Sequence, residues 1–400
     1  MFVDQQSSSP MLFSSTNELV LFYVDHTVHF SRNTGIQRCV RSLSRALLEQ
    51  GVRLQPVVWN RPNKTLVPAP LIALEHLAKW SGPEPKQWSV SVTSSIDDAA
   101  CWLVIVELVS GPHNPSTCEL IAESKRHALK IAWMFHDAIP VRCSSLYGSL
   151  ANAAASAHSI YMSGLAQYEL VLANSFTSAE HLQKFWSEKQ ISPQAQLAVV
   201  PLADEIPAQE RLPRAKNDVS IVLCVSSLEP RKNHVALLKA FTWLVFHNIW
   251  PANLTLVLVG WPNDKHVVGQ VERAIEIGLP LLWDSNVDDV RLRELYQTAL
   301  FSIYPSLEEG FGLPVAESLW HRRPCLCSGE GALGELASSG GCFTVNTRYW
   351  KNISRGLNLL ISDEDLRLRL LDQIDNRKMR RWHDVASDWR NYLNINGEQH

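Results

Sequence analysis

The sequence predicts an α/β protein made of two doubly wound domains, and three observations support this fold class. With 400 residues, the chain is longer than one hydrophobic core usually supports, so two domains are expected. Short apolar, β-rich runs alternate with helical stretches in both halves, as in parallel sheets covered by crossover helices. Between the halves, residues 203–217 are rich in Pro, Glu, Arg and Lys, which predicts an interdomain linker.

The first half begins with an apolar strand and then alternates between strands and helices. Its apolar runs are short and bounded by polar loops, which indicates buried parallel strands joined by crossovers. The expected elements lie at residues 19–25, 35–49, 54–59, 102–107, 130–135, 151–165, 170–173 and 197–200. Pro201 ends the last strand.

The same pattern restarts after the linker. The expected elements lie at residues 220–225, 234–246, 254–259, 289–298, 301–304, 314–320 and 325–327, followed by helices at 353–360 and 363–374. We therefore predict a first domain over residues 1–202, a second over 218–376 and a basic tail over 377–400. Two such sheets in tandem place the crevices at their strand ends opposite each other, which suits an enzyme with two substrates.

Composition and charge exclude several classes of protein. Hydrophobic residues make up 46% of the chain, and 37 Lys and Arg against 40 Asp and Glu leave a net charge of −3. A nucleic-acid partner held by bulk charge is therefore not expected. The apolar run at 99–106 is far shorter than a spanning helix, and the first eleven residues lack the features of a signal peptide. We expect a cytoplasmic protein.

Cysteine spacing gives no metal site. The eight cysteines contain no C-x-x-C pair, so neither a zinc ribbon nor a thioredoxin-type centre is predicted. The one D-x-D string, Asp363 to Asp365, opens a predicted helix and is interpreted as a helix cap. We predict no metal and no cofactor.

The most informative segment is 304–317, at the end of a predicted strand. Gly310 and Gly312 allow a tight turn, and Pro314 suits the first position of the following helix. The free amides at that helix start would form an anion site.

Glu309 lies on this turn and Glu317 on the helix, so one carboxylate can reach a sugar while the other accepts bonds from ribose hydroxyls. The segment resembles the E-x7-E signature of retaining glycosyltransferases of family 4, which have the GT-B fold. The resemblance implies a second domain that binds a nucleotide sugar and a first domain on the acceptor side. It also implies that the turn contacts the donor phosphates through Gly310, Phe311, Gly312 and Leu313.

A basic motif lies upstream, between a strand and a helix. The segment 228–233 resembles the phosphate-binding motif of the same family, which implies that Arg231 and Lys232 hold the donor diphosphate. Two cations stabilise a leaving phosphate and replace a metal there. The alternative is a pair of solvated loop charges. Ser226 and Ser227 stand where many family members have a glycine.

The first half carries a second strand-to-helix turn. Thr34 and Gly35 offer free amides to a phosphate or to the acceptor. The string from Thr34 to Arg38 resembles mannosyl- and D-rhamnosyl-type members of family 4 that build bacterial surface polysaccharides. Arg38, Arg41 and Arg45 share a helix face, which predicts contact with a polyprenyl diphosphate or anionic lipid, or else a solvated stripe.

His136 and Asp137 follow another strand at the cleft edge and also resemble this subgroup. The likeness implies that His136 touches the donor sugar or supports the reaction centre, with Asp137 beside it. A structural His is the alternative. In the next turn, 174–178, we expect Ser or Thr to cap a helix.

Together, these residues and the resemblance imply a retaining hexosyltransferase that uses a nucleoside diphosphate sugar, with GDP favoured, and a glycan or polyprenyl-linked acceptor. The arginine stripe and the basic residues 377–382, with Trp389 nearby, predict peripheral contact with the inner membrane face. The alternative is that the tail packs back on the first domain. The rivals are an inactive GT-B-like scaffold and a dinucleotide oxidoreductase. The G-x-G-x-x-G string at 329–334 comes too late in the chain for the oxidoreductase.

Overall fold

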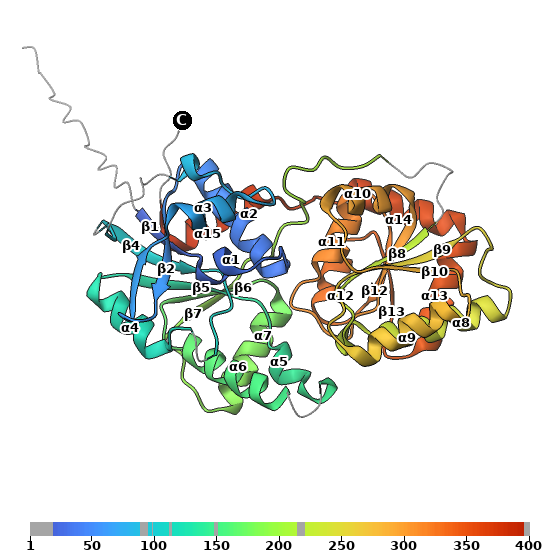
Figure 1. The fold of residues 1–400 in the computed structure, drawn as a ribbon, viewed down its shortest axis with the longest axis horizontal. Coiled ribbons are helices and arrows are strands. Elements are labelled where there is room, and N and C mark those ends of the chain that lie inside the picture. The colour runs from blue at the N-terminus through green and yellow to red at the C-terminus, as the bar shows by residue number, and fades with distance from the viewer. Residues whose placement is uncertain are drawn as a thin grey trace, which may run out of the picture.

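The computed structural model describes residues 19–88, 95–97, 99–111, 114–147, 151–213 and 221–395. Figure 1 shows two α/β bodies side by side, the first coloured blue to green and the second yellow to red. Each body contains one sheet covered by helices on both faces. The predicted class of two doubly wound domains is confirmed.

The first domain holds a seven-stranded sheet with the order β3-β2-β1-β4-β5-β6-β7. Its strands are β1 (Leu19–Tyr23), β2 (Arg53–Asn60), β3 (Thr65–Pro68), β4 (Ala100–Ile105), β5 (Lys130–Phe135), β6 (Leu170–Ala173) and β7 (Gln196–Val199). Neighbours pair in parallel except β2 and β3, which form an antiparallel hairpin at one edge. This hairpin departs from the all-parallel expectation.

The interior strand β1 is fully buried because both faces of the sheet are covered. Val20 and Phe22 belong to one hydrophobic cluster, and Leu19, Leu21 and Tyr23 belong to the other. Alternate side chains of a strand point to opposite faces, so an unbroken apolar run suits this position. The covering helices are α1 (Asp25–His29), α2 (Gly35–Glu49), α3 (Leu71–Ala78), α4 (Thr117–Arg126), α5 (Ile139–Arg142), α6 (Ala151–Leu165) and α7 (Phe176–Glu188).

The second domain holds a six-stranded parallel sheet with the order β10-β9-β8-β11-β12-β13. Its strands are β8 (Ile221–Val225), β9 (Thr255–Val259), β10 (Leu281–Asp284), β11 (Ala299–Tyr304), β12 (Cys325–Ser328) and β13 (Cys342–Val345). Its helices are α8 (His234–Phe246), α9 (Lys265–Glu276), α10 (Asp289–Thr298), α11 (Leu313–Trp320), α12 (Gly331–Ala337), α13 (Trp350–Ser362) and α14 (Glu364–Asn376). Strand β13 was not predicted.

Strand order reverses between β1 and β4 in the first sheet and between β8 and β11 in the second. In doubly wound sheets, ligands bind outside the carboxyl ends of the strands at such a reversal. The two reversal points therefore fix where the turns after β1, β5, β8 and β11 can gather around a ligand.

The chain crosses back from the second domain to the first at its end. Helix α15 (Trp382–Leu393) packs against α2, and both Trp382 and Trp389 are buried. The indole of Trp102 in β4 donates to the carbonyl of Leu393 at 3.0 Å. The predicted insertion of Trp389 at lipid headgroups is therefore wrong, and the alternative, a tail that packs on the first domain, is correct.

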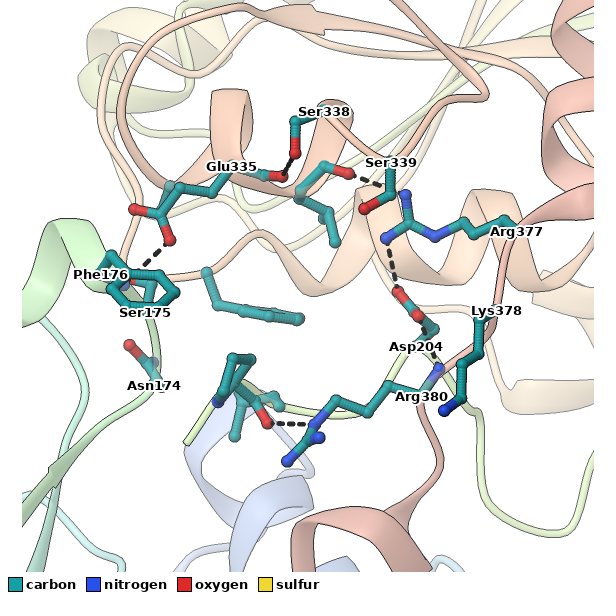
Figure 2. Close-up of a pocket in the computed structure, with 15 residues that line it drawn as sticks. Asn174, Ser175, Phe176, Asp204, Glu335, Ser338, Ser339, Arg377, Lys378 and Arg380 are labelled. Atoms are coloured by element: carbon teal, nitrogen blue, oxygen red, sulfur yellow. Dashed lines mark hydrogen bonds and ion pairs between the residues drawn. The ribbon is translucent and has the colours of Figure 1, made fainter. Parts of the chain in front are cut away.

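The basic residues of this crossing are also engaged within the chain. Figure 2 shows Arg377 reaching Asp204, with Nη2 3.2 Å from Oδ1. The backbone amide of Arg380 donates to the same carboxylate at 2.9 Å, and its Nε donates to the carbonyl of Pro201. Asp204, at the start of the predicted linker, thus anchors the tail. Residues 214–217 of that linker lie outside the described residues.

The predicted arginine stripe on α2 is not a free surface. Arg41 is buried, donates to the carbonyls of His76 and Leu77, and lies 4.7 Å from the ring centroid of Trp80. Arg45 pairs with Glu49 on its own helix. No continuous lipid-binding or solvated stripe forms, because α3 covers Arg41 and Glu317 of the second domain pairs with Arg38, while Arg45 stays partly exposed. The helices of the described ranges are all too short or too polar to span a bilayer.

Candidate active site

A pocket of about 270 Å³ lies between the two domains, at the reversal points of both sheets. The first domain contributes the start of α2 at Gly35, and His136 and Asp137 after β5. The second domain contributes Ser226 and Ser227 after β8, Lys232, and residues 309–314 after β11. Segments that the sequence analysis selected separately therefore meet in one place.

Glu309 lines this pocket and is held by four donors to a single oxygen. Its Oε1 lies 2.6 Å from Lys232 Nζ, 2.7 Å from Arg231 Nη1, 2.8 Å from Tyr304 Oη and 2.6 Å from Ser306 Oγ. Burial disfavours the carboxylate, but Lys232 and Arg231 outweigh burial and lower the pKa of Glu309 to about 2. No described group bonds Oε2, so the second oxygen is available to a ligand.

Arg231 and Lys232 are already neutralised in this structure. Both side chains are nearly buried, and Arg231 pairs with Glu229 at 3.0 Å as well as with Glu309. Burial lowers the pKa of Lys232, although Glu309 acts in the opposite direction. The pair is therefore not a set of solvated loop charges. A bound diphosphate would have to draw these cations from the carboxylates.

A left-handed residue holds the basic turn against the rest of the domain. Asn233 has φ 61° and its side-chain amide donates to the carbonyls of Pro305 and Thr347, at 3.2 and 2.7 Å. Asn tolerates this backbone conformation better than most residues. Its side chain connects the starts of α8, of the signature turn and of the segment before α13.

Gly310 is required by close approach of the two domains. A Cβ at this position would meet the carbonyl oxygen of His136 at 2.1 Å. The carbonyl of Gly310 accepts a hydrogen bond from Ser175 Oγ at 2.6 Å and another from Ser178 Oγ at 3.2 Å. The signature turn therefore docks directly on the first domain.

His136 and Asp137 have different surroundings. Nε2 of His136 lies 2.6 Å from the carbonyl of Val106, so it carries the proton and donates, which leaves Nδ1 as an acceptor. Burial lowers the pKa of His136, so the ring is neutral near pH 7. Asp137 accepts from the amide of Ile139 at 2.9 Å at the start of α5. Asp137 therefore lines the pocket and also holds the first amide of this helix.

The side chains of Glu317 and Arg38 form an ion pair with each other. Glu317 is buried on α11, and its carboxylate accepts from the guanidinium of Arg38 on α2. Glu317 does not line the described pocket, whereas Arg38 does. Arg231 and Thr34 also stay outside the lining, and the Thr34 hydroxyl bonds Gln37 instead.

The turn at 174–178 caps a helix as predicted, and a second cap comes from the other domain. Ser175 Oγ accepts from the amide of Ser178 at 3.0 Å. Glu335 of α12 accepts from the amides of Phe176 and Thr177, at 2.9 and 2.5 Å, as Figure 2 shows for Phe176. Glu335 is 158 positions from Thr177, so nothing in the local sequence indicates this contact.

A second pocket of about 310 Å³ lies on the other side of Glu309. Arg142 of α5 pairs there with Glu308, and His181 Nδ1 lies 3.7 Å from the same carboxylate. Arg348, from the loop before α13, also lines it. This second pocket spans both domains, and the sequence analysis did not select Arg142, His181 or Arg348.

The D-x-D string is a helix cap, as expected. Asp363 Oδ1 accepts from the amide of Leu366 at 2.8 Å at the start of α14.

Ser226, at the position where many family members have a glycine, bonds His234 across 3.1 Å and lines the interdomain pocket.

The chain is similar to known glycosyltransferases in sequence and in fold. Residues 206–377 match the family model "Glycosyl transferases group 1". A segment of 121 residues is 36% identical to O-antigen chain mannosyltransferase B of Escherichia coli, covering 30% of this chain and 31% of that protein. A segment of 120 residues is 30% identical to the serotype-specific mannosyltransferase WbdA of Escherichia coli, covering 29% of this chain and 14% of that protein. The similarity therefore spans less than a third of either relative.

Solved structures share the fold at low identity. Sucrose-phosphate synthase from Thermosynechococcus elongatus matches with a TM-score of 0.64 and 14% identity, over 94% of this chain and 98% of that one. Trehalose-6-phosphate synthase OtsA matches with a TM-score of 0.56 and 13% identity, over 75% and 73%. These structures are glycosyltransferases of the GT-B type, and this chain has the GT-B fold.

Proposed function

We propose that the chain is a retaining hexosyltransferase. It moves a mannose- or rhamnose-like hexose from a nucleoside diphosphate sugar, with GDP favoured, to a hydroxyl of a glycan or polyprenyl-linked glycan. One observation carries the proposal. The basic turn, the signature turn and His136 come from two domains and line a single interdomain pocket around Glu309.

The donor would lie along the second domain. Lys232 and Arg231 exchange part of their pairing with Glu309 for the diphosphate, which carries more charge. The amides of Gly310, Phe311, Gly312 and Leu313, where the turn enters α11, face the same anion.

The ribose would require a rearrangement. Glu317 accepts the ribose hydroxyls only after Arg38 leaves its carboxylate. Donor binding is thereby coupled to a change in the contact between the domains.

The transfer needs no nucleophile from the protein. The bond between C1 of the sugar and the phosphate oxygen breaks, and the acceptor oxygen forms a bond to C1 on the same face. The acceptor proton passes to the departing phosphate oxygen, so charge and atoms balance. Lys232 and Arg231 stabilise the negative charge that grows on the phosphate.

Glu309 and His136 position the sugar. The free Oε2 of Glu309 accepts a sugar hydroxyl and stabilises positive charge near C1, because the carboxylate stays ionised at neutral pH. The neutral His136 offers Nδ1 to another hydroxyl. The acceptor enters through the second pocket, past Arg142 and His181.

The names of the relatives support the choice of sugar. Both Escherichia coli proteins are named mannosyltransferases, and one is named for the O-antigen chain. A mannose-type donor and a surface-glycan acceptor are therefore the first candidates for this chain.

The test is a donor panel with the purified chain. GDP-mannose, GDP-rhamnose, UDP-glucose and UDP-N-acetylglucosamine are each incubated with mannose oligosaccharides, with and without EDTA, and release of the nucleoside diphosphate is measured. We expect release with a GDP-sugar and full activity in EDTA. Binding of nucleotide without turnover of any donor would support the inactive scaffold instead, and a strict metal requirement would contradict the metal-free chemistry.

A further inference from the structure

A pocket of about 460 Å³ lies outside the cleft, between α8 and α13. Figure 1 shows both helices on the side of the second domain away from the first. The indoles of Trp243 and Trp350 line it, with ring centroids 6.4 Å apart and planes inclined by 54°. Trp243 is 39% exposed. His247 stacks on one face of Trp243, with ring centroids 4.2 Å apart, which leaves the other face of this indole for a ligand.

The remaining lining supplies hydrogen bonds. Lys351, Ser354, Arg355 and Asn358 face the pocket from one side of α13. The side chains of Arg355 and Asn358 form no hydrogen bond or ion pair with any other residue that the structure describes. Both therefore have donors, and Asn358 an acceptor, available to a ligand. The described lining contains no acid, histidine or cysteine, so the pocket is suited to binding rather than catalysis.

This chemistry fits a sugar ring. A pyranose has an apolar face of C–H groups that packs on an indole and a rim of hydroxyls that bonds amide and guanidinium groups. An anionic membrane fits less well. The ammonium groups of Lys239 and Lys351 lie 5.2 and 6.0 Å from the ring centroid of Trp350, so they are held over the indole, and both indoles line a hollow instead of projecting.

The chain connects this pocket to the transfer site. Arg348 lines the second interdomain pocket beside Glu309, and Trp350 follows two residues later. Two residues of extended chain separate their Cα atoms by at most about 7 Å. The side chain of Asn233 fixes the segment before Arg348 to the start of α8 through the carbonyl of Thr347. A long acceptor that leaves the transfer site past Arg348 would therefore meet the tryptophans.

We propose that the hollow between Trp243 and Trp350 is a second glycan-binding site, which holds an internal stretch of a neutral, linear hexose chain while the chain end is at Glu309. The inference deepens the proposed function, on which its role in transfer rests. It makes the substrate a polymer rather than a single sugar or a short acceptor.

Direct binding tests the site without any need for turnover. The full chain and its variants Trp350→Ala and Asn358→Ala are titrated calorimetrically with a linear mannose hexasaccharide and with GDP. Phe246→Ala is the matched control, because Phe246 is a 68% exposed aromatic on α8 outside the pocket lining. We expect both pocket variants to weaken hexasaccharide binding roughly tenfold, the control to match the parent, and GDP affinity to stay constant.

Kinetics then separate this inference from the proposed function. If transfer occurs, both pocket variants should raise KM for the mannose hexasaccharide as acceptor. KM for a mannose disaccharide acceptor, which is too short to reach the pocket, should stay unchanged. Loss of hexasaccharide binding in the variants without transfer from any donor would support the glycan site and overturn the proposed function. Equal hexasaccharide binding by parent and variants, or none by the parent, would overturn the site. Binding to anionic vesicles that the variants lose, without oligosaccharide binding, would assign the pocket to lipid and also overturn the site.

Discussion

Arg38 and Glu317, 279 positions apart and in different domains, form an ion pair across the cleft. The Glu317 side chain is 4% exposed, so the pair lies largely out of water. Helix α11, which carries the second signature carboxylate, is thereby bound to α2 of the first domain. Each binding event at Glu317 must compete with this contact.

Glu317→Ala should weaken nucleotide binding. Hydrogen bonds to a charged group contribute about 1.5 to 3 kcal/mol each, but the ribose replaces Arg38, so we expect a loss of only about tenfold. Calorimetric titration with GDP and UDP measures it, with Glu294→Ala on the exposed face of α10 as control. Unchanged affinity in a folded Glu317 variant would remove the ribose assignment.

Arg231→Ala and Lys232→Ala should each lose far more affinity for a nucleoside diphosphate than for the monophosphate, because the missing charge faces the outer phosphate. Each change also leaves Glu309 short of one partner, so a lower melting temperature is expected. Lys265→Ala, an exposed lysine of α9, is the control. Equal weakening of both ligands would contradict this assignment, because the pair would then serve structure or contact only the phosphate that both ligands share.

Stability should fall in acid because of Glu309. Its pKa in the folded protein is about 2, below the ordinary value of 4.5, so the stabilisation is complete above pH 4.5 and is lost as the pH falls toward 2. The shift corresponds to a free energy on the order of 3 kcal/mol. Urea midpoints across this range measure it.

Glu309→Gln is the comparison variant for that measurement. It should be less stable at neutral pH, because Lys232 and Arg231 lose a buried counter-charge, and its midpoint should depend less on pH. Parallel pH curves for the parent and the variant would show that another group controls the acid transition.

Gly310→Ala should reduce transfer by at least roughly tenfold while the chain stays folded, since misplacement by about 1 Å can cost a hundredfold in rate. The added Cβ would meet the carbonyl of His136 at 2.1 Å, which forces the signature turn away from the first domain. Gly269→Ala is the matched control, since no atom lies within 4 Å of the Cβ it would add. Transfer at the parent rate in the Gly310 variant would mean that this close contact is not used in catalysis.

Local patterns predicted the framework well. The helices expected at 234–246 and 289–298 match α8 and α10, because buried apolar positions repeat at the helical period. The turn at Gly310 was predictable because glycine permits tight turns and close approach of the backbone. The cap at Ser175 was predictable because serine is a preferred residue at helix N-termini.

Contacts distant in sequence could not be predicted in the same way. The spacing of Arg38, Arg41 and Arg45 places them on one face of α2 but does not say what covers that face. In the structure Glu317 covers Arg38, and the carbonyls and Trp80 around α3 cover Arg41. The basic residues of the tail suggested a membrane-binding surface for the same reason, because the sequence does not show that Asp204 bonds Arg377 and Arg380.

The anomeric configuration of the first product tests the central claim most directly. Proton NMR would follow the purified chain with GDP-mannose and a mannose oligosaccharide from the first turnovers. We predict a new anomeric signal with the configuration of the donor, absent when GDP-mannose is omitted and strongly reduced in Glu309→Gln. A first product of inverted configuration, or an equal rate in Glu309→Gln, would contradict the account.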